Sequence, residues 1–347
     1  MLATKDTNVV EQQTTTHVCP NCGGTSFGKL ISAGRIHRES MYRERFVLER
    51  FKRRPSRAEL KDLTDFAHGD AAAILACARC GVCVRDEPAE ESERTYIEDP
   101  YDPALIDLLF PRYVQAFRDK AEPYRMLLPP GARVLEIGSH YGAFLRVASE
   151  WGWQPIGIDI GKDTSRYAKS KGYLVFNSEL PDCAFPGAIF DGVFVWNCFE
   201  QIPEPRPLLQ EIRRVLKPQG ILVVRTPNAL FYETCETLLF EPDQSHHAEE
   251  FALNAMAYNN LLAFPYLYGY NSGNLNELVT REDFQLAGAI NSELLTLPLP
   301  EIPEWVAREQ QVLRAAIERM NAAAALRPGA LLTGPWIELY YRAEQGA

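Results

Sequence analysis

Two stretches decide the fold of this 347-residue chain: Val-Leu-Glu-Ile-Gly-Ser-His-Tyr-Gly at residues 134–142 and Ile-Gly-Ile-Asp-Ile at residues 156–160. In each, an apolar run that is typical of a buried strand ends at a carboxylate. The first run enters a glycine-bounded loop, and the amphipathic segment from Ala143 to Trp151 then predicts a helix. This order of strand, loop, helix and strand indicates a parallel α/β sheet, whose strand ends hold nucleoside-bearing ligands.

The loop residues suggest how such a ligand would be held. Gly138 and Gly142 let the backbone turn tightly and approach a ligand closely. Asp159 follows Gly138 by 21 residues, at the end of the next strand, where a carboxylate can accept hydrogen bonds from both hydroxyls of a ribose. We therefore predict that this loop and Asp159 bind a nucleoside-bearing cofactor.

Two later runs extend the pattern, Phe-Asp-Gly-Val-Phe-Val-Trp-Asn at 190–197 and Leu-Lys-Pro-Gln-Gly at 216–220 with the apolar run after it. With Glu136-x-Gly-x-x-x-Gly142 and Asp159, they resemble the class I S-adenosylmethionine-dependent methyltransferases over about residues 130–228. Two departures from that family are visible. His140 replaces the middle glycine of the loop, and Glu200-Gln201 replaces a frequent Glu-His pair after the fourth strand.

The resemblance implies an α/β fold: a doubly wound, seven-stranded, mostly parallel sheet of the Rossmann-like methyltransferase type, with a final antiparallel strand. Helices are predicted at Pro207–Leu216, Thr280–Gly288 and Glu304–Leu326. The predicted strands lie near 133–137, 155–160, 173–177, 191–197, 220–226, 288–297 and 335–342.

The resemblance also implies the cofactor, S-adenosyl-L-methionine, and its contacts. The loop would approach the methionine and ribose portions, Glu136 would anchor the loop or the amino group, and Asp159 would bind the ribose hydroxyls. Ile160 would pack on the adenine, and Asn197 would lie near the methionine carboxylate. The residues predicted to bind the cofactor are Glu136, Gly138, Ser139, His140, Gly142, Asp159, Ile160, Asn177, Ser178 and Asn197.

Four of the eight cysteines form two matched motifs, Cys19-Pro-Asn-Cys22-Gly and Cys77-Ala-Arg-Cys80-Gly. Two Cys-x-x-Cys turns are typical of a tetrahedral four-thiolate zinc site, which is structural because it has no open coordination position. We predict Zn²⁺ bound by Cys19, Cys22, Cys77 and Cys80. The alternatives are a ligand set in which Cys83 replaces Cys77 or Cys80, and a set of free buried cysteines.

The N-terminal third divides by composition into three parts. We predict a mobile polar terminus at 1–16, a zinc-binding module at 17–90 and an acidic, proline-containing linker at 91–103. The module contains a basic insert, Arg35–Lys61, with ten Lys and Arg against four Glu. Its apolar residues have helical spacing, so it is either a solvated helix face packed on the domain, which we favour, or a patch for an acidic partner such as a phosphorylated substrate or RNA.

The remainder, 104–347, is predicted to be the methyltransferase domain. Its segment 229–280 is long for a connection, contains an aromatic cluster and follows the fifth strand, so we predict a lid over the acceptor site. Its His246 and His247 are the predicted catalytic residues, as bases for the acceptor. The alternatives are aromatic residues in the core or in a dimer contact, and surface histidines.

The composition and charge of the chain restrict the classes of function and the locations that it could have. The net charge of −10 disfavours nucleic acid as a partner. Neither a secretory signal nor an 18-residue apolar run is present, so we expect a cytoplasmic protein that does not span a membrane.

The leading hypothesis is a methyltransferase for a small-molecule acceptor of the sugar or secondary-metabolite type. The alternatives are an RNA methyltransferase that reads nucleic acid with its zinc module, and a catalytically silent binding protein of the same fold. A nicotinamide-dependent oxidoreductase is disfavoured, because His140 would block a pyrophosphate. The oligomeric state stays open, with a homodimer among the alternatives.

Overall fold

The computed structural model describes residues 12–14, 17–49, 72–86, 103–239, 246–262, 264–293 and 332–344, with three positions between 315 and 322. Several predicted features therefore lie wholly or largely outside the described residues: the terminus at 1–16, the second half of the basic insert, the linker at 91–103 and the helix at Glu304–Leu326.

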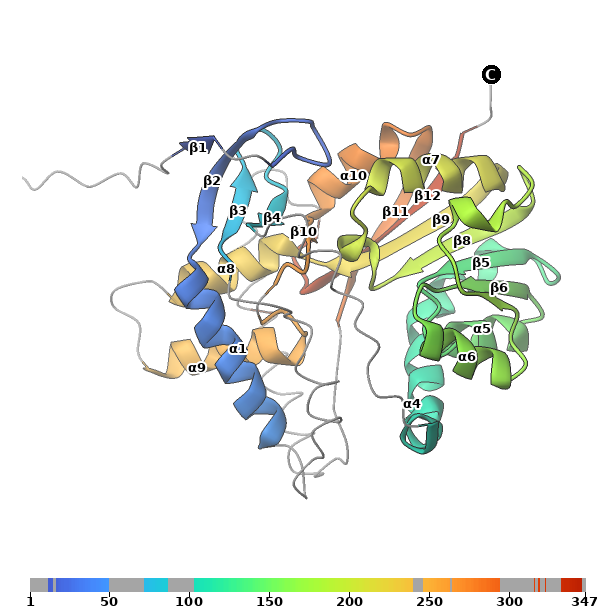
Figure 1. Cartoon of the computed structure of the whole chain (residues 1–347), viewed down its shortest axis with the longest axis horizontal. Helices are drawn as coiled ribbons and strands as arrows, with labels where there is room; N and C mark the ends of the chain where they lie inside the picture. The colour runs from blue at the N-terminus through green and yellow to red at the C-terminus, as the bar shows by residue number, and fades with distance from the viewer. Residues whose placement is uncertain are drawn as a thin grey trace, which may run out of the picture.

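A seven-stranded sheet organises the C-terminal two thirds of the chain (Figure 1). Its strand order is β11-β12-β9-β8-β5-β6-β7, in which the five strands from β9 to β7 are parallel and β12 is antiparallel to both neighbours. The predicted fold class is thus confirmed. The strands are β5 (Arg133–Ile137), β6 (Gln154–Ile158), β7 (Val175–Phe176), β8 (Phe190–Trp196), β9 (Leu216–Pro227), β11 (Phe284–Ser292) and β12 (Trp336–Ala343).

Helices cover both faces of this sheet. On one face, Phe144 and Ala148 pack against Val134 and Phe194, and on the other Leu209 joins a larger core. The first face carries α4 (Pro103–Ala121), α5 (Ala143–Glu150) and α6 (Lys162–Ser170), and the second carries α7 (Pro205–Val215) and α10 (Ser272–Thr280). Short 3-10 helices occur at η2 (Glu122–Leu127), η3 (Pro181–Cys183) and η4 (Phe199–Gln201).

The prediction of a helix at Thr280–Gly288 is wrong, because the helix in this part of the chain, α10, spans Ser272–Thr280. A capping box, in which Asn271 and Asn274 exchange side-chain and backbone hydrogen bonds, starts α10 at Ser272, and the helix ends at Thr280. Residues from Phe284 onward belong to β11 instead, because they pair with β12. That partner lies some 50 residues away in sequence, where a local pattern cannot indicate it.

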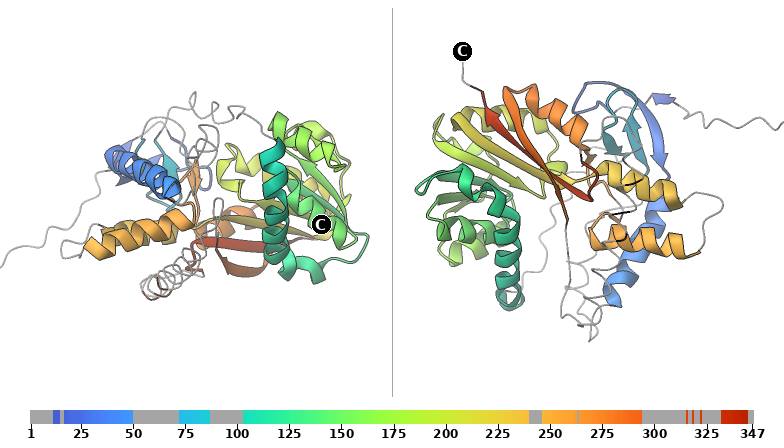
Figure 2. Two further views of the ribbon diagram at one scale, coloured as in Figure 1. Left: turned by 90° about the horizontal axis from the view of Figure 1, so that it is seen from below. Right: turned by 180° about the vertical axis from the view of Figure 1, so that it is seen from behind.

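A second, antiparallel sheet builds the N-terminal module, in the order β1-β2-β3-β4-β10. The strands β2, β3 and β4 come from the module, whereas β1 comes from the end of the segment predicted to be a mobile terminus and pairs with β2. The fifth strand, β10, comes from the segment predicted as a lid. Figure 2 shows this sheet beside the larger one, with α1 (Ala33–Leu48) next to α9 (His246–Tyr258). The remaining elements are β1 (Gln12–Thr14), β2 (Ser26–Ile31), β3 (Ile74–Cys77), β4 (Cys83–Arg85), β10 (Tyr268–Gly269) and α8 (Ala229–Leu239).

One hydrophobic core joins the two sheets. Phe27 and Val82 of the module share a cluster of buried side chains with Leu275 of α10 and Leu339 of β12. Within the described ranges, no helix combines the length and apolarity that a membrane crossing needs.

The strand order reverses between β5 and β8, because the chain runs outward from β5 to β6 and β7 and then returns to β8. In open α/β sheets, the crevice at the carboxyl ends of strands at such a reversal is where ligands bind. The candidate site therefore lies where β5 and β8 end.

Candidate functional site

The loop after β5 has backbone conformations that explain its glycines. Gly138 and Gly142 have φ angles of +71° and +83°, in the left-handed region that favours glycine. A Cβ at Gly138 would lie 2.6 Å from Cys198 Sγ, and a Cβ at Gly142 would lie 2.8 Å from the Tyr173 ring. The loop thus needs glycine at both positions, for conformation and for space.

His140, which takes the place of the family's middle glycine, also has a positive φ of 46°. Its backbone N–H donates to Oδ2 of Asp159 at 2.7 Å, so the loop is tied to the end of β6. The other carboxylate oxygen of Asp159 accepts from the Gly161 N–H at 2.9 Å and from Thr164 Oγ1 at 2.7 Å. Three donors therefore fix the orientation of this buried carboxylate.

The residues predicted to contact adenine lie next to Asp159, the predicted ribose ligand. Asn177 Nδ2 donates to the carbonyl oxygens of Asp159 and Ile160, both at 2.9 Å. The Ile160 side chain is 46% exposed, so an apolar surface is available beside the loop, and Ser178 follows Asn177 just after β7. The structure thus brings the loop, Asp159, Ile160 and Asn177 to one end of the sheet.

Two buried polar side chains, one on β5 and one in the loop itself, each have an atom that lacks a hydrogen-bond partner within the described part of the chain. Among the described residues, Oε2 of Glu136 and Oγ of Ser139 are buried without a hydrogen-bond partner. Burial raises the pKa of Glu136 well above its usual range, and the charge of Asp159 raises it further, whereas the charge of Lys120 on α4 opposes the shift. Both side chains therefore have unused hydrogen-bonding atoms close to the end of β5.

Asn197, immediately after β8, is held by a network that the sequence did not reveal. Its Oδ1 accepts a hydrogen bond from Arg225 Nη1. The guanidinium of Arg225 is fully buried, pairs with Glu338 at 3.1 Å and lies over the Trp336 ring. In the sequence, this network could have been indicated only by two charged residues within the apolar runs of two strands, Arg225 in β9 and Glu338 in β12.

Glu200, in η4, is a further buried carboxylate at this end of the sheet. Thr226 Oγ1 on β9 donates to its Oε2 at 3.2 Å. Burial raises the pKa of Glu200 to about 7, although hydrogen bonds from its own backbone N–H, Gln201 and Thr226 lower it. In the sequence, Glu200 stands out only because Glu200-Gln201 differs from the family's Glu-His pair, a pattern that indicates no role for the carboxylate.

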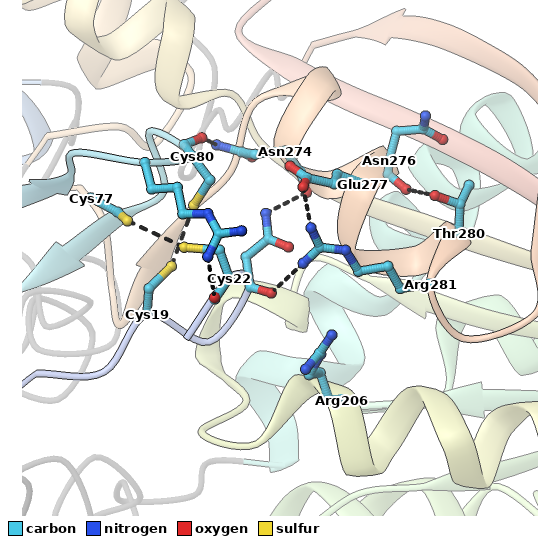
Figure 3. A network of polar contacts seen from close by, with 12 residues as sticks. Cys19, Cys22, Cys77, Cys80, Arg206, Asn274, Asn276, Glu277, Thr280 and Arg281 are labelled. Carbon is cyan, nitrogen blue, oxygen red and sulfur yellow. Dashed lines mark hydrogen bonds and ion pairs between the residues drawn. The ribbon is translucent and has the colours of Figure 1, made fainter. Parts of the chain in front are cut away.

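The four cysteines predicted as zinc ligands converge on one point (Figure 3). Cys19 Sγ lies 3.4 Å from Cys80 Sγ, Cys22 Sγ lies 3.5 Å from Cys77 Sγ, and all four sulfurs lie within 4.8 Å of one another. Tetrahedral zinc with Zn–S bonds of about 2.3 Å requires S···S separations of about 3.8 Å, so the donor set fits the metal. Cys83 takes no part in the cluster, and its Sγ contacts Glu233 Oε1 at 3.6 Å.

The cysteine turns dock on α10 through side-chain amides (Figure 3). Asn21 Nδ2 donates to the carbonyl of Asn274 at 3.0 Å, and Asn274 Nδ2 donates to the carbonyl of Cys80 at 3.3 Å. Arg281 Nη1 donates to the carbonyl of Asn21 at 2.9 Å. The candidate metal site is therefore linked to the helix that leads into β11.

The segment 229–280 contributes several of its aromatic rings to the core. Tyr258 packs edge-on against Phe46 of α1, with ring centroids 4.8 Å apart, and Tyr270 contacts Phe199 at 5.5 Å. His246 and His247 begin α9, but their side chains fall outside the described residues. Their catalytic role and the lid function of the segment stay predictions.

A family model described as a methyltransferase domain matches residues 109–287. An uncharacterized protein of Methanocaldococcus jannaschii is 28% identical over 108 residues, which are 31% of this chain and 50% of that protein. The demethylmenaquinone methyltransferase of Tropheryma whipplei is 31% identical over 101 residues, 27% of this chain and 41% of the relative.

The alignments span half or less of the length of these curated relatives. Among solved structures, an S-adenosylmethionine-dependent methyltransferase of Thermotoga maritima aligns with 70% of this chain and 95% of its own, at 15% identity and a TM-score of 0.43.

Proposed function

This chain belongs to the methyltransferase domain family, and on that premise we propose that it is a class I S-adenosylmethionine-dependent methyltransferase whose acceptor is a small molecule. The observation that carries the proposal is the fixed carboxylate of Asp159 beside the glycine loop, at the reversal of strand order. When bound, S-adenosylmethionine supplies a methyl group on a sulfonium cation, ready for in-line displacement.

The residues of this chain would bind and orient that cofactor. Asp159 would accept hydrogen bonds from the ribose hydroxyls, Ile160 would cover the adenine, and Asn177 and Ser178 would border it. Gly138 and Gly142 would allow close backbone approach, and the buried Glu136 and Ser139 would bind polar atoms beneath the loop. Such a site accelerates transfer mainly by holding the acceptor in line with the methyl group.

A small-molecule acceptor is favoured over RNA by the charges of the basic insert. Arg35 is buried and forms ion pairs with Glu39 at 3.7 Å and with Glu236 of α8 at 3.4 Å. Arg45, which is exposed, pairs with Glu49. In the described half of the insert, these arginines serve internal ion pairs, and the net charge of −10 also opposes binding of a polyanion. An acceptor with a hydroxyl group would need a general base, the role proposed for His246 or His247.

The proposal includes a structural zinc ion held by Cys19, Cys22, Cys77 and Cys80. The sulfur separations support it, and a four-thiolate site leaves no open position for chemistry. Because thiolate ligands must stay reduced, the proposal also includes a cytoplasmic location.

Calorimetric titration of the purified chain with S-adenosylmethionine and S-adenosylhomocysteine tests the function. We expect one site per chain for each ligand. Transfer of the labelled methyl group to a panel of small hydroxyl and amine acceptors, compared with bulk RNA, then tests the acceptor class. A protein that binds neither ligand would refute the proposed function.

A further inference from the structure

Glu200 is a buried carboxylate at the end of the sheet where the cofactor is proposed to bind. It lies in the turn directly after β8, and its Oε2 accepts from Thr226 at the end of β9. Neither the cofactor set nor the predicted bases include it. Removal of this carboxylate from water makes its ionisation costly, and the charge of Arg225 offsets only part of that cost, because the pKa of Glu200 stays raised.

The topology indicates which part of the cofactor Glu200 faces. If Asp159 at the end of β6 binds the ribose, the methionine portion extends across the end of β5 toward β8, because β5 lies between these two strands. Cys198 Sγ packs directly over Gly138 of the loop. Glu200 follows two residues later in η4. Burial raises the pKa of the Cys198 thiol, and the charge of Glu200, like the charges of Asp159 and Glu136, raises it further, so Glu200 lies close to this end of the loop.

We propose that Glu200 distinguishes the cationic cofactor from its neutral product: its carboxylate faces the sulfonium and strengthens binding of S-adenosylmethionine relative to S-adenosylhomocysteine. This inference rests on the proposed function and adds a specificity-determining residue to it. On methyl transfer, the S–C bonding pair stays on sulfur, which becomes a neutral thioether, and the attraction to Glu200 ends. The product is thereby released more readily than the cofactor.

The charge state of Glu200 makes the attraction dependent on pH. Because burial raises its pKa to about 7, the carboxyl is shared between protonated and ionised forms in the free protein at neutral pH. A sulfonium nearby favours the ionised form, so binding of S-adenosylmethionine releases a proton, whereas binding of the neutral thioether does not.

Three titratable groups that interact with Glu200 behave differently from it. Arg225 on β9 interacts with it as a cation, and even with a pKa lowered by burial to about 10 it stays charged at pH 7. Burial raises the pKa of Cys198 and of Tyr270 well above their usual ranges, so both stay neutral. Among these groups, Glu200 alone titrates near neutral pH.

Calorimetric titration of the full chain with each ligand, at pH 6 and pH 8 and in two buffers of different ionisation enthalpy, tests the proposal. In the wild type, we expect the preference for S-adenosylmethionine over S-adenosylhomocysteine to rise about fivefold to tenfold from pH 6 to pH 8. We also expect a net release of protons on binding S-adenosylmethionine near pH 7.

Glu200→Gln should remove both effects, and Glu204→Gln, the same change at an exposed position four residues away, should keep both. Titration of the ligands' own amino groups is common to all variants and cancels in this comparison. Should Glu200→Gln fold poorly, Thr226→Val serves instead: it removes the hydroxyl that lowers the pKa of Glu200, so the midpoint of the pH dependence should move to higher pH.

A Glu200→Gln protein that retains the pH-dependent preference, or a wild type that shows none, would overturn the role of Glu200. Failure of the wild type to bind either ligand would instead count against the proposed function. The two failures are therefore distinguishable.

Discussion

At the scale of single residues, the candidate cofactor site contains side chains whose conformations are fixed by hydrogen bonds before any ligand binds. The three donors on Asp159 hold its carboxylate in one orientation before any ligand arrives. Groups held in this way lose little conformational freedom on binding, so more of their interaction energy contributes to affinity. Two predictions follow at this scale, one for the carboxylate and one for the loop.

Asp159→Ala should weaken binding of S-adenosylmethionine by roughly 2–3 kcal/mol, because two charge-assisted hydrogen bonds to the ribose are lost. Calorimetry measures the change. Asp163→Ala, an aspartate on α6 that pairs with Arg166, is the matched control and should bind normally. Equal affinity of the Asp159 variant and the wild type would remove Asp159 from the site.

Gly138→Ala should lower the free energy of unfolding and impair cofactor binding, since the new Cβ would lie 2.6 Å from Cys198 Sγ. Gly131→Ala is the control, because Gly131 also has a positive φ but no atom within 4 Å of a Cβ. Its cost should be limited to about 1–2 kcal/mol of backbone strain. Adding Cys198→Ala to Gly138→Ala should restore part of the loss in denaturant unfolding, and no recovery would show that the contact is not the cause.

At the scale of elements, hydrogen bonds and strand pairing connect the zinc module to α10 and to the strand that precedes it. Asn21, Asn274 and Arg281 connect the cysteine turns to the helix, and β10 completes the module's sheet. Metal bound by the four cysteines would thus stabilise structure beyond the module itself, because zinc binding to such sites is coupled to folding.

Purified protein should contain about one zinc per chain, and Cys19→Ser should release it and increase hydrogen exchange in α10 as well as in β3 and β4. Elemental analysis and exchange mass spectrometry measure the two effects. Cys83→Ser is the control and should keep the metal, since Cys83 contacts Glu233 instead of the cluster. Loss of zinc in the Cys83 variant would mean that the ligand set is wrong.

At the scale of the whole molecule, the two sheets share a core, so the boundary at the linker does not separate two independent hydrophobic units. Leu275 and Leu339 of the larger domain are buried in the same cluster as Phe27 and Val82 of the module. Removal of the module would expose that surface to water, at a cost of about 25 cal/mol for each Å² of apolar area.

We therefore expect a fragment of residues 104–347 to be unstable or aggregated at 25 °C, while the full chain is folded. Circular dichroism and size-exclusion chromatography compare the two. A soluble fragment with a cooperative unfolding transition close to that of the full chain would show that the module is dispensable for folding.

Short sequence patterns were sufficient to predict the sheet, the glycine loop, the position of Asp159 and the pairing of the two Cys-x-x-Cys turns. The sheet, the loop and the position of Asp159 depend on residues close together in sequence, where periodicity and glycine conformation act locally. The two Cys-x-x-Cys turns are far apart in sequence, and their matched ligand spacing was what indicated that they share one metal site. The α10 boundary was misplaced because a capping box and a distant strand partner, rather than local periodicity, set it.

Only the tertiary structure decided the contacts between distant segments. Glu338 neutralises Arg225 across 113 residues, Asn21 meets Asn274 across 253, and β10 joins a sheet whose other strands precede it by more than 180 residues. The raised pKa of Glu200 is also a consequence of the tertiary structure, because it is caused by burial among the surrounding elements. A local pattern holds no information on such contacts, since chain folding alone selects which buried polar groups meet.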